Sequence, residues 1–313
     1  MTTPLLQSSG DMIADRRFVL AEALSDRGDL AAAADVLTQA IERAPRFVSA
    51  WHALGEVREL LGDRDGAVAA FQQACALDPE DRHGAGLHLV RLGALPPGDM
   101  PAAYVRTLFD QYAPSFRTTL TQRLGYRGPQ ILHQAIAAAC KAEGRPMDFT
   151  DMLDLGCGTG LVGEVFFGCT RRIVGVDLSE RMVAELRKGP EVFRLYDRVE
   201  NGDLLQFLHA EACDDRRYDL IVAADVFPYL AWLPPVIAAA AGVLVPGGLL
   251  TFTVETHAGD DVVLGAKLRY QHGAAHVREA IAGAGLTPVS IDERSARNER
   301  GSPSPGLVVV AQS

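Results

Sequence analysis

The sequence predicts an α/β protein whose sheet is doubly wound and mostly parallel, preceded by a small all-α domain. Two observations carry this prediction. After about residue 150, short apolar segments alternate with helical ones, as in parallel sheets whose strands are joined by helices. Before residue 82, the chain contains an internal repeat of helical character. We therefore expect two domains, residues 1–95 and 96–313, in agreement with a length of 313 residues.

Composition and charge narrow the class of protein. Hydrophobic residues make up 48% of the chain, which is enough to fill the cores of both domains. The sequence has no apolar run of membrane length, and its first ten residues lack the basic and apolar regions of a signal peptide, so we expect a cytoplasmic protein with no membrane partner. The formal net charge of −10 and the dispersed positions of Arg294, Arg297 and Arg300 argue against a nucleic-acid substrate.

The cysteines and histidines match no known metal-binding motif. The five cysteines include no CxxC pair, which predicts buried thiols rather than disulfides or zinc ligands: Cys75, Cys140, Cys157, Cys169 and Cys213. His272, His276 and Glu279 could be helical metal ligands, but Gly273 separates the histidines and no zinc motif is matched. We therefore expect no metal.

The repeat occupies the most acidic part of the chain. Residues 1–81 contain 14 acidic residues against seven arginines and no lysine. A period of 34 residues aligns two units, about 14–47 and 48–81, through these pairs: Leu20 and Leu54, Gly28 and Gly62, Asp29 and Asp63, Ala33 and Ala67, Ala40 and Ala74, Pro45 and Pro79. Both units resemble tetratricopeptide repeats, which implies pairs of closely packed helices.

A helical segment and a break mark the end of the repeat region. Two repeats are fewer than the roughly three that such arrays need for a continuous core. Leu87, Val90 and Leu92 therefore predict a capping helix, before the sequence Leu-Pro-Pro-Gly at residues 95–98 breaks the chain. We interpret the repeats either as a surface for a protein partner or self-association, or as a support for the second domain.

A glycine-dense turn follows the first predicted strand of the second domain. The apolar strand 151–155 runs into this turn, and the next strand, 172–177, ends at Asp177. Glycines let the backbone bend sharply and approach a ligand, and an acid nineteen residues after Gly158 suits a ribose diol. Gly158, Gly160 and Gly163 also satisfy the GxGxxG spacing of dinucleotide folds. The turn alone therefore does not decide between a dinucleotide and another cofactor that contains ribose.

The surroundings of the turn resemble the class I S-adenosylmethionine-dependent methyltransferases. Asp154 and Gly156, placed ahead of the overlapping fingerprint, look like the beginning of that family's motif I. Four later segments follow in the family's order: 175–179 (GVDLS), 201–204 (NGDL), 218–222 (YDLIV) and 244–248 (LVPGG). The resemblance implies a Rossmann-like methyltransferase sheet of seven strands, with S-adenosyl-L-methionine as the cofactor.

The resemblance also implies which residues bind the cofactor. They lie in the turn and just after the next two strands: Asp154, Gly156, Gly158, Gly160, Asp177, Leu178, Asp203 and Leu204. The turn would hold the methionine part of the cofactor. Asp177 would take the ribose hydroxyls, and Asp203 would accept from the adenine amine with Leu204 beside the ring.

The segment 104–116 resembles the region before motif I in bacterial methyltransferases that carry N-terminal tetratricopeptide repeats. In that group it lies over the cofactor, which makes Tyr112 a predicted cofactor contact, with Phe109 and Phe116 as further aromatic candidates near the sulfonium. Their spacing of three and four residues also fits the buried stripe of a helix, the interpretation that we favour for Phe109. Arg117 stands where relatives tend to carry an acid.

The remaining elements follow from the alternation of apolar and amphipathic segments. Strands are predicted at 151–155, 172–177, 197–200, 218–223, 248–254, 286–292 and 306–311. Helices are predicted at about 129–141, 160–168, 179–188, 204–211 and 231–243. The last two strands are joined by a polar loop at 295–305 rather than by a helix, so we expect the final strand to be antiparallel.

The candidates for chemistry lie where strands end, because ligands of open α/β sheets bind beyond the carboxyl ends of the strands. Asp225 follows the fourth strand, and we place it beside the methionyl amine of the cofactor or beside the acceptor. His257 follows the fifth strand, and His272 precedes a later helix. Either histidine, or a carboxylate, could remove a proton from an oxygen or nitrogen acceptor, whereas a thioether acceptor needs no base.

The sequence therefore predicts an S-adenosylmethionine-dependent methyltransferase that acts on a small-molecule acceptor, with a repeat domain in front. One alternative is a protein or peptide methyltransferase whose repeats present the substrate. The other is a cofactor-binding interaction module without turnover.

Overall fold

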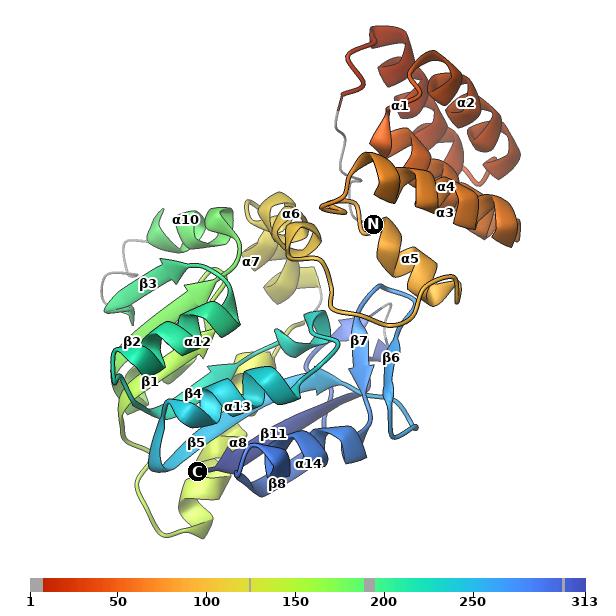
Figure 1. Cartoon of the computed structure of the whole chain (residues 1–313). Coiled ribbons are helices and arrows are strands. Elements are labelled where there is room, and N and C mark those ends of the chain that lie inside the picture. Colours follow the sequence, from red (N-terminus) through yellow and green to blue (C-terminus); the bar gives the residue numbers. More distant parts are fainter. Residues whose placement is uncertain (1–7, 124, 189–194, 300–301) are drawn as a thin grey trace. The chain divides into compact units, whose positions relative to one another are not determined.

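The structure, a computed structural model, has two compact units, residues 1–107 and 108–313 (Figure 1). It describes every residue except 1–7, 124, 189–194 and 300–301. The predicted domain boundary at residue 95 lies between the last helix of the repeat region and the helix that leads from one unit into the other. Among the described helices, none combines the length and the apolar character needed to cross a membrane.

Two helix pairs and a short fifth helix form the first unit. The helices are α1 (Met12–Asp26), α2 (Leu30–Arg43), α3 (Val48–Leu60), α4 (Arg64–Leu77) and α5 (Ala85–Arg91). Gly28 and Gly62 turn the chain within each pair at positive φ angles of 82° and 78°, which glycine tolerates. Asp29 and Asp63 then cap the second helix of each pair with their carboxylates. The predicted tetratricopeptide-type helix pairs are confirmed.

Small residues let the helices of the repeats pack closely. The matched alanines are at most 1% exposed: Ala33, Ala40, Ala67 and Ala74. A Cβ added at Gly55 would lie 2.6 Å from the ring of Phe71, so the close approach of α3 to α4 requires glycine there. α5 packs against α4 through an apolar cluster that includes Phe71 and Leu89. It lies where the capping helix is predicted.

The second unit is built on a mixed sheet. Seven of its described strands follow the order β3-β2-β1-β4-β5-β11-β8. Their bounds are β1 (Phe149–Leu155), β2 (Thr170–Asp177), β3 (Arg198–Asn201), β4 (Tyr218–Ala223), β5 (Leu244–Glu255), β8 (Thr287–Glu293) and β11 (Gly306–Gln312). β11 runs antiparallel to β5 and β8, whereas β3, β2, β1, β4 and β5 pair in parallel. The predicted doubly wound sheet with one antiparallel strand is confirmed.

Helices cover both faces of this sheet (Figure 1). One layer contains α12 (Leu204–Cys213), α13 (Pro234–Gly242) and α14 (Ala274–Gly283), and the other contains α8 (Gly128–Ala142), α9 (Leu161–Phe166) and α10 (Glu180–Lys188). Side chains alternate along a strand, so Ile221 and Ala223 of β4 face the first layer while Leu220 and Val222 face the second. A strand that is buried on both faces has a continuous apolar sequence, which made β4 predictable.

Several short elements are additional to the prediction. β6 (Val262–Leu264) and β7 (Tyr270–His272) form an antiparallel pair, and β7 also pairs with β5. β9 (Asn298–Glu299) and β10 (Ser302–Pro303) form a hairpin within the predicted polar loop. α6 (Ala102–Tyr112) contains most of the segment whose aromatic spacing fits a helix, and α7 (Phe116–Thr118) and a π-helical turn, η1 (Thr119–Arg123), lie between it and α8.

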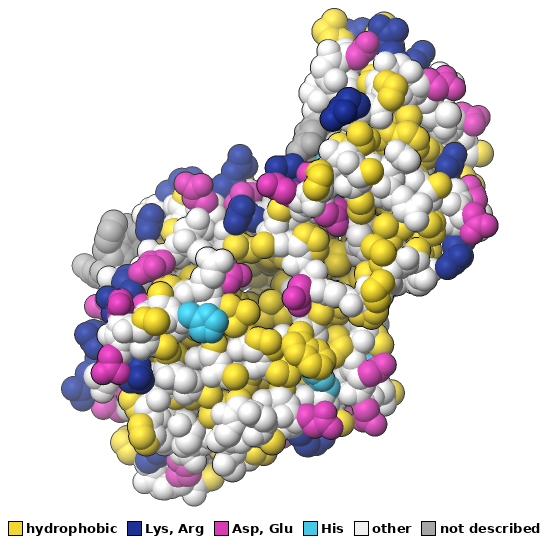
Figure 2. Space-filling model, viewed as in Figure 1, with side chains coloured by type: hydrophobic (Ala, Val, Ile, Leu, Met, Phe, Trp, Pro, Cys, Tyr) yellow, Lys and Arg dark blue, Asp and Glu magenta, His cyan; other side chains and the backbone are white. Residues whose placement is uncertain are grey.

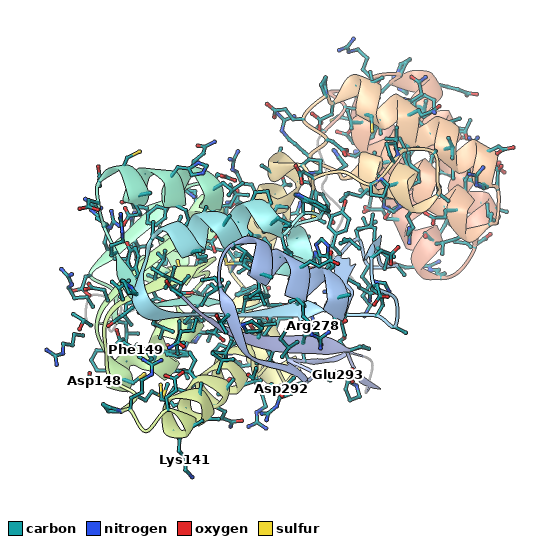
Figure 3. The ribbon with its side chains drawn as sticks, turned by 60° about the horizontal axis from the view of Figure 1, so that its bottom comes forward. Lys141, Asp148, Phe149, Arg278, Asp292 and Glu293 are labelled. Carbon is teal, nitrogen blue, oxygen red and sulfur yellow. The ribbon has the colours of Figure 1, made fainter. Side chains whose placement is uncertain are left out.

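The two edges of the sheet differ in what they carry. Figure 3 shows the edge where β1 begins, with Asp148 and Phe149 labelled, and Lys141 near the end of α8. The residues predicted to bind the cofactor lie at the opposite edge, where the parallel strands end. On the visible face of the molecule, Lys and Arg side chains alternate with Asp and Glu (Figure 2).

Candidate cofactor and active site

The glycine turn after β1 has a backbone that glycine alone adopts easily. Gly156, Gly158 and Gly160 have φ angles of 72°, 52° and 89°. The N–H of Gly156 donates to the carbonyl of Val176 at 2.8 Å, which ties the turn to β2. A Cβ at Gly156 would lie 2.4 Å from a methyl group of Val226. The turn is therefore a tight cradle whose shape depends on these glycines.

Asp154 lies fully buried beneath the turn. Its Oδ2 accepts a hydrogen bond of 2.5 Å from the hydroxyl of Tyr196, which in turn accepts from the N–H of Gly163 at 3.0 Å. Burial raises the pKa of the Asp154 carboxyl to about 7, although the Tyr196 hydrogen bond acts in the opposite direction. Its Oδ1 has no hydrogen-bond partner among the described residues. A buried carboxylate oxygen that lacks a hydrogen-bond partner is suited to accept from a cationic donor.

Asp177, at the end of β2, is brought directly against the turn. Its Oδ2 accepts from the N–H of Gly158 at 2.8 Å, and its Oδ1 accepts from the N–H of Ser179 at 2.8 Å. Burial raises the pKa of Asp177 to about 6. Each carboxylate oxygen keeps a further lone pair, so the group can still accept hydroxyl donors.

Asp203 and its neighbours hold the ends of β2 and β3 together. One Asp203 oxygen caps α12 by accepting from the N–H groups of Leu205 and Gln206 at 3.0 and 3.1 Å. Asn201 donates through its amide to the carbonyls of Asp177 and Leu178 at 2.9 and 3.0 Å. Asp203, Leu178 and Leu204 are all half-buried, so this part of the edge remains partly open.

One aromatic residue of α7 lies over the turn, and an aromatic residue of α6 packs beside it. A Cβ at Gly158 would be 3.6 Å from the ring of Phe116. Phe109 stacks edge-on against Phe116 and Tyr229, with ring centroids 6.1 and 5.0 Å apart. Burial raises the pKa of Tyr112, and Arg269 opposes that shift. Tyr112 therefore lies on the side of the site that is occupied by the charged residues after β4 and β5.

Those charged residues form a mostly buried cluster of two carboxylates and two guanidinium groups, Asp225, Glu255, Arg269 and Arg297. Asp225 accepts from Arg297 at 2.7 Å, and Glu255 accepts from both Arg297 and Arg269. Burial raises the pKa of Asp225, and Arg297 opposes that shift. Burial also opposes the charge of Arg297, yet the carboxylates raise its pKa.

Arg297 was counted from the sequence among dispersed arginines, but it is only 7% exposed. The long loop before β11 brings it to Asp225, 72 positions earlier in the chain. Asp225 itself adopts a left-handed φ of 62°, and its N–H donates to the hydroxyl of Thr253 at 2.8 Å. Such a backbone is uncommon outside glycine and is found at functional positions.

The two candidate histidines lie in different environments. His257 is half-buried, and its Nε2 is 3.0 Å from the carbonyl of Asp261. His272 is fully buried in β7, where its Nε2 is 3.0 Å from the carbonyl of Leu230. Burial lowers the pKa of His272 to about 4. This environment suits a neutral imidazole that holds β7 in place better than a base that exchanges protons, so a catalytic role of His272 stays a prediction.

A pocket of about 430 Å³ lies next to the charged cluster. Its lining includes Arg127 just before α8, Gln134 within α8, and Arg294 and Arg297 from the loop before β11. The glycine turn contributes no residue to it. The pocket and the turn are therefore two different features of the second unit.

Sequence reasoning missed three residues of this region. Tyr196 supports Asp154, and Arg297 completes the charged cluster. Asp110 of α6 accepts from the hydroxyl of Ser179 at 2.5 Å and so connects α6 to the end of β2. Tyr196 and Arg297 belong to no motif, and Asp110 lies in a segment of which only the aromatic residues have a predicted role. Each acts across at least 40 positions of sequence, so a local pattern does not identify its partner.

Family models match both units. Residues 153–250 match a methyltransferase domain, a range that begins within β1 and ends within β5, and residues 18–82 match a tetratricopeptide repeat. The second unit thus contains a Rossmann-like methyltransferase domain. The chain as a whole combines this domain with tetratricopeptide repeats in front of it, and the resemblances predicted from the sequence are confirmed.

Curated relatives match the two parts separately. Ubiquinone biosynthesis O-methyltransferases of Rhodopseudomonas palustris (strain BisA53) and Bradyrhizobium sp. (strain ORS 278) are 30% and 31% identical over 100 and 103 residues, in each case 32% of this chain and 37% of the relative. The chain thus spans little more than a third of those relatives. The TPR repeat-containing protein PA0015 of Pseudomonas aeruginosa is 37% identical over 60 residues, 19% of this chain and 57% of that protein.

Solved structures similar to this chain include an S-adenosylmethionine-dependent methyltransferase from Clostridium acetobutylicum, with a TM-score of 0.46 and 15% identity, covering 65% of this chain and 98% of that one. The N-methyltransferase NodS from Bradyrhizobium japonicum, in complex with S-adenosyl-L-homocysteine, has a TM-score of 0.44 and 21% identity, covering 59% and 86%.

Proposed function

We propose that this protein is an S-adenosylmethionine-dependent methyltransferase that acts on a small-molecule acceptor. The observation that carries the proposal is the hydrogen bond from the N–H of Gly158 to the Asp177 carboxylate, which joins the glycine turn after β1 to the end of β2. Because Asp177 keeps free lone pairs beside a backbone without Cβ atoms, it can bind a ribose diol at the edge of the sheet.

The other residues of the turn fit the same cofactor. The unpartnered Oδ1 of buried Asp154 matches the ammonium group of a methionine moiety. Asp203 caps α12 through one carboxylate oxygen, which leaves the other for an adenine amine. When bound, the cofactor supplies a methyl group on a sulfonium that is already activated for transfer.

The chain's own residues then align the acceptor and exclude water. Phe116, Phe109 and Tyr229 form an aromatic wall that extends from the turn toward the charged cluster. The aromatic faces also favour a cation beside them. Half-buried His257 is available to take a proton from an oxygen or nitrogen acceptor.

The small-molecule acceptor is supported by the matched relatives, whose name describes O-methyl transfer in ubiquinone biosynthesis. The repeats support a second candidate, a protein or peptide acceptor, because tetratricopeptide arrays present a surface to partners. A cofactor-binding module without turnover is the third candidate, and a cytoplasmic location stays a prediction.

Cofactor binding can be tested by calorimetry with S-adenosyl-L-homocysteine. Asp177→Ala is expected to weaken binding at least 100-fold, because it removes the ribose acceptor and the bond that holds the Gly158 N–H. Asp219→Ala is a matched control, since Asp219 also accepts from two backbone N–H groups, those of Thr150 and Asp151, at the other edge of the sheet. Full affinity in a folded Asp177→Ala protein would contradict the site.

The acceptor can be tested with a labelled methyl donor. We expect label to enter the small molecules of a cell extract when they are separated from its proteins. Label in protein alone would favour the second candidate. Tight cofactor binding without label in either fraction would contradict turnover and favour the third.

A further inference from the structure

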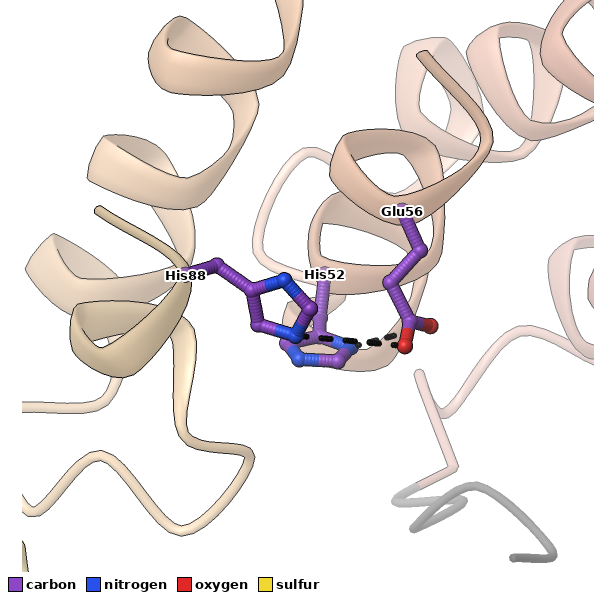
Figure 4. A group of neighbouring side chains, drawn as sticks. All are labelled: His52, Glu56 and His88. Carbon is purple, nitrogen blue, oxygen red and sulfur yellow. Dashed lines mark ion pairs between the residues drawn. The ribbon is translucent and has the colours of Figure 1, made fainter. Parts of the chain in front are cut away.

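Two histidines and a glutamate converge in the first unit, far along the chain from the methyltransferase residues (Figure 4). His52 and Glu56 lie one turn apart on α3, and His88 comes from α5. The Nδ1 of His52 is 3.4 Å from Glu56, and the Nε2 of His88 is 4.0 Å from the same carboxylate. One ligand atom from each of the three residues lies within 4.8 Å of the other two.

We propose that His52, Glu56 and His88 bind a zinc ion. Imidazole nitrogens and a carboxylate are ligands that zinc accepts, usually in tetrahedral geometry. With bonds of about 2 Å, two ligand atoms of a tetrahedron are about 3.3 Å apart. The separations of 3.4 and 4.0 Å are to the two different oxygens of Glu56, and the three ligand atoms all lie within 4.8 Å of one another, so the side chains must rotate toward a common centre to complete the site.

Neighbouring groups already orient the rings. The Nδ1 of His88 is 3.2 Å from Glu59, whose carboxylate also accepts from Arg91 at 2.6 Å. The same Arg91 nitrogen is 3.0 Å from the Nδ1 of His88. In the tautomer that carries its proton on Nδ1 and donates to Glu59, the Nε2 lone pair is free for an ion held beside Glu56, which is the usual arrangement of a metal-binding histidine and its carboxylate partner. In that tautomer the Arg91 N–H groups serve the Glu59 carboxylate and not the ring. The His88 ring also stacks on Phe71 at 4.4 Å.

One side of the cluster is open to solvent. His52 and His88 are 8% and 6% exposed, whereas the side chain of Glu56 is 44% exposed. An ion can therefore enter past Glu56, and a water molecule can fill the fourth position. Three protein ligands with one open position are typical of zinc sites that retain a water.

The ion would connect helices that belong to different parts of the array. α3 opens the second repeat, and α5 is the seven-residue helix that follows it. Two repeats provide little core for so short a helix, and a metal bridge would fix its position. The sequence contained the His52–Glu56 spacing, but the third ligand lies 32 positions after Glu56 and no zinc motif joins them.

The test uses the full chain after treatment with a chelator. Zinc chloride is titrated by calorimetry, and cobalt chloride is titrated by visible absorption, which reports the geometry of the bound ion. We expect one ion per chain, the absorption of a four- or five-coordinate cobalt, and a higher melting temperature of the first unit with zinc. Absence of zinc binding at micromolar concentrations would overturn the proposal.

Variants locate the site. Glu56→Gln keeps the size of a half-exposed side chain and is expected to weaken zinc binding at least tenfold, and His88→Gln should do the same. His83→Gln is the matched control, a buried histidine of the same unit whose Nε2 is 3.1 Å from the Ser49 hydroxyl. Unchanged binding in a folded Glu56→Gln protein, or loss in His83→Gln with full binding in His88→Gln, would overturn the assignment.

Discussion

At the scale of single residues, the site places carboxylates in surroundings that disfavour their charge. Asp154 and Asp177 both have a raised pKa, about 7 and about 6, because burial penalises the charged form. A cationic ligand relieves this penalty, since it supplies the opposite charge in a region shielded from water. The two acids therefore cost the protein stability and contribute to cofactor affinity for the same reason.

Asp154→Asn tests whether this buried acid lowers the stability of the protein and raises its affinity for the cofactor. Between the ordinary pKa of 3.8 and a folded-state pKa of about 7, the folded chain binds the proton more tightly than the unfolded chain. The contribution of Asp154 to stability is therefore full below about pH 4 and is lost as pH rises toward 7. Asparagine cannot ionise and so loses no stability as pH rises. Between pH 5 and pH 8, the free energy of unfolding of the variant is therefore expected to rise relative to that of the native protein by on the order of 3 kcal/mol.

The measurement is denaturant unfolding of both proteins at the two pH values. Only the difference between the proteins is used, because ionisable groups that do not interact with Asp154 contribute equally to both. A difference that stays constant with pH would show that Asp154 is not the responsible group. The same variant should also bind S-adenosyl-L-homocysteine more weakly, because the acceptor for the cofactor ammonium becomes neutral.

Arg297 is expected to contribute more to the stability of the protein than an ion pair at the surface does. Arg297→Met is expected to lower the free energy of unfolding by about 3 kcal/mol, because it leaves the mostly buried Asp225 without its guanidinium partner. Arg294→Met, three residues earlier and exposed, is expected to change it by less than about 0.5 kcal/mol. Equal effects of the two substitutions in chemical denaturation would contradict the role assigned to the buried cluster.

At the scale of elements, the helices and strands predicted correctly are those whose own residues carry a recognisable sequence pattern. β1, β2, β4 and β5 have apolar runs, and the repeat helices have glycine turns and aspartate caps. β6, β7, β9 and β10 have two or three residues each, too few for a periodic pattern. Their existence depends on contacts such as the pairing of Glu255 with Gln271, which only the folded chain provides.

The same distinction applies to the site. The glycines and acids of the turn lie in one motif, so spacing identified them together. Tyr196, Asp110 and Arg297 reach the site from elements that are distant in sequence, and their residue types are common on surfaces. Long-range partners of this kind follow from the topology and not from any short pattern.

The aromatic segment of α6 and α7 is the element whose role can be isolated. Phe116→Ala is expected to weaken cofactor binding about tenfold, because the ring lies over Gly158 and shields the turn from water. The melting temperature should change little, since Phe116 is only half-buried. Calorimetry and thermal unfolding of the same sample check both statements, and a large loss of stability with unchanged affinity would assign the ring to packing alone.

At the scale of the whole molecule, the residues assigned to the cofactor all lie within 108–313. Removal of residues 1–95 is therefore expected to leave the affinity for S-adenosyl-L-homocysteine within about threefold of the native value. Calorimetry on the shortened protein measures this directly. A loss of cofactor binding in a folded shortened protein would mean that the repeats support the site rather than serve a partner.

The placement of β11 has a consequence for how the chain is made. This strand lies between β5 and β8, and β8 pairs with no other described strand. Because residues 287–293 precede residues 306–312 in the chain, β8 emerges from the ribosome before the strand with which it pairs, and it cannot join the sheet until that strand follows. The sheet is complete only after residues 306–312 have emerged, and until then the side of β5 that pairs with β11 is an unpaired strand edge on which another chain can add.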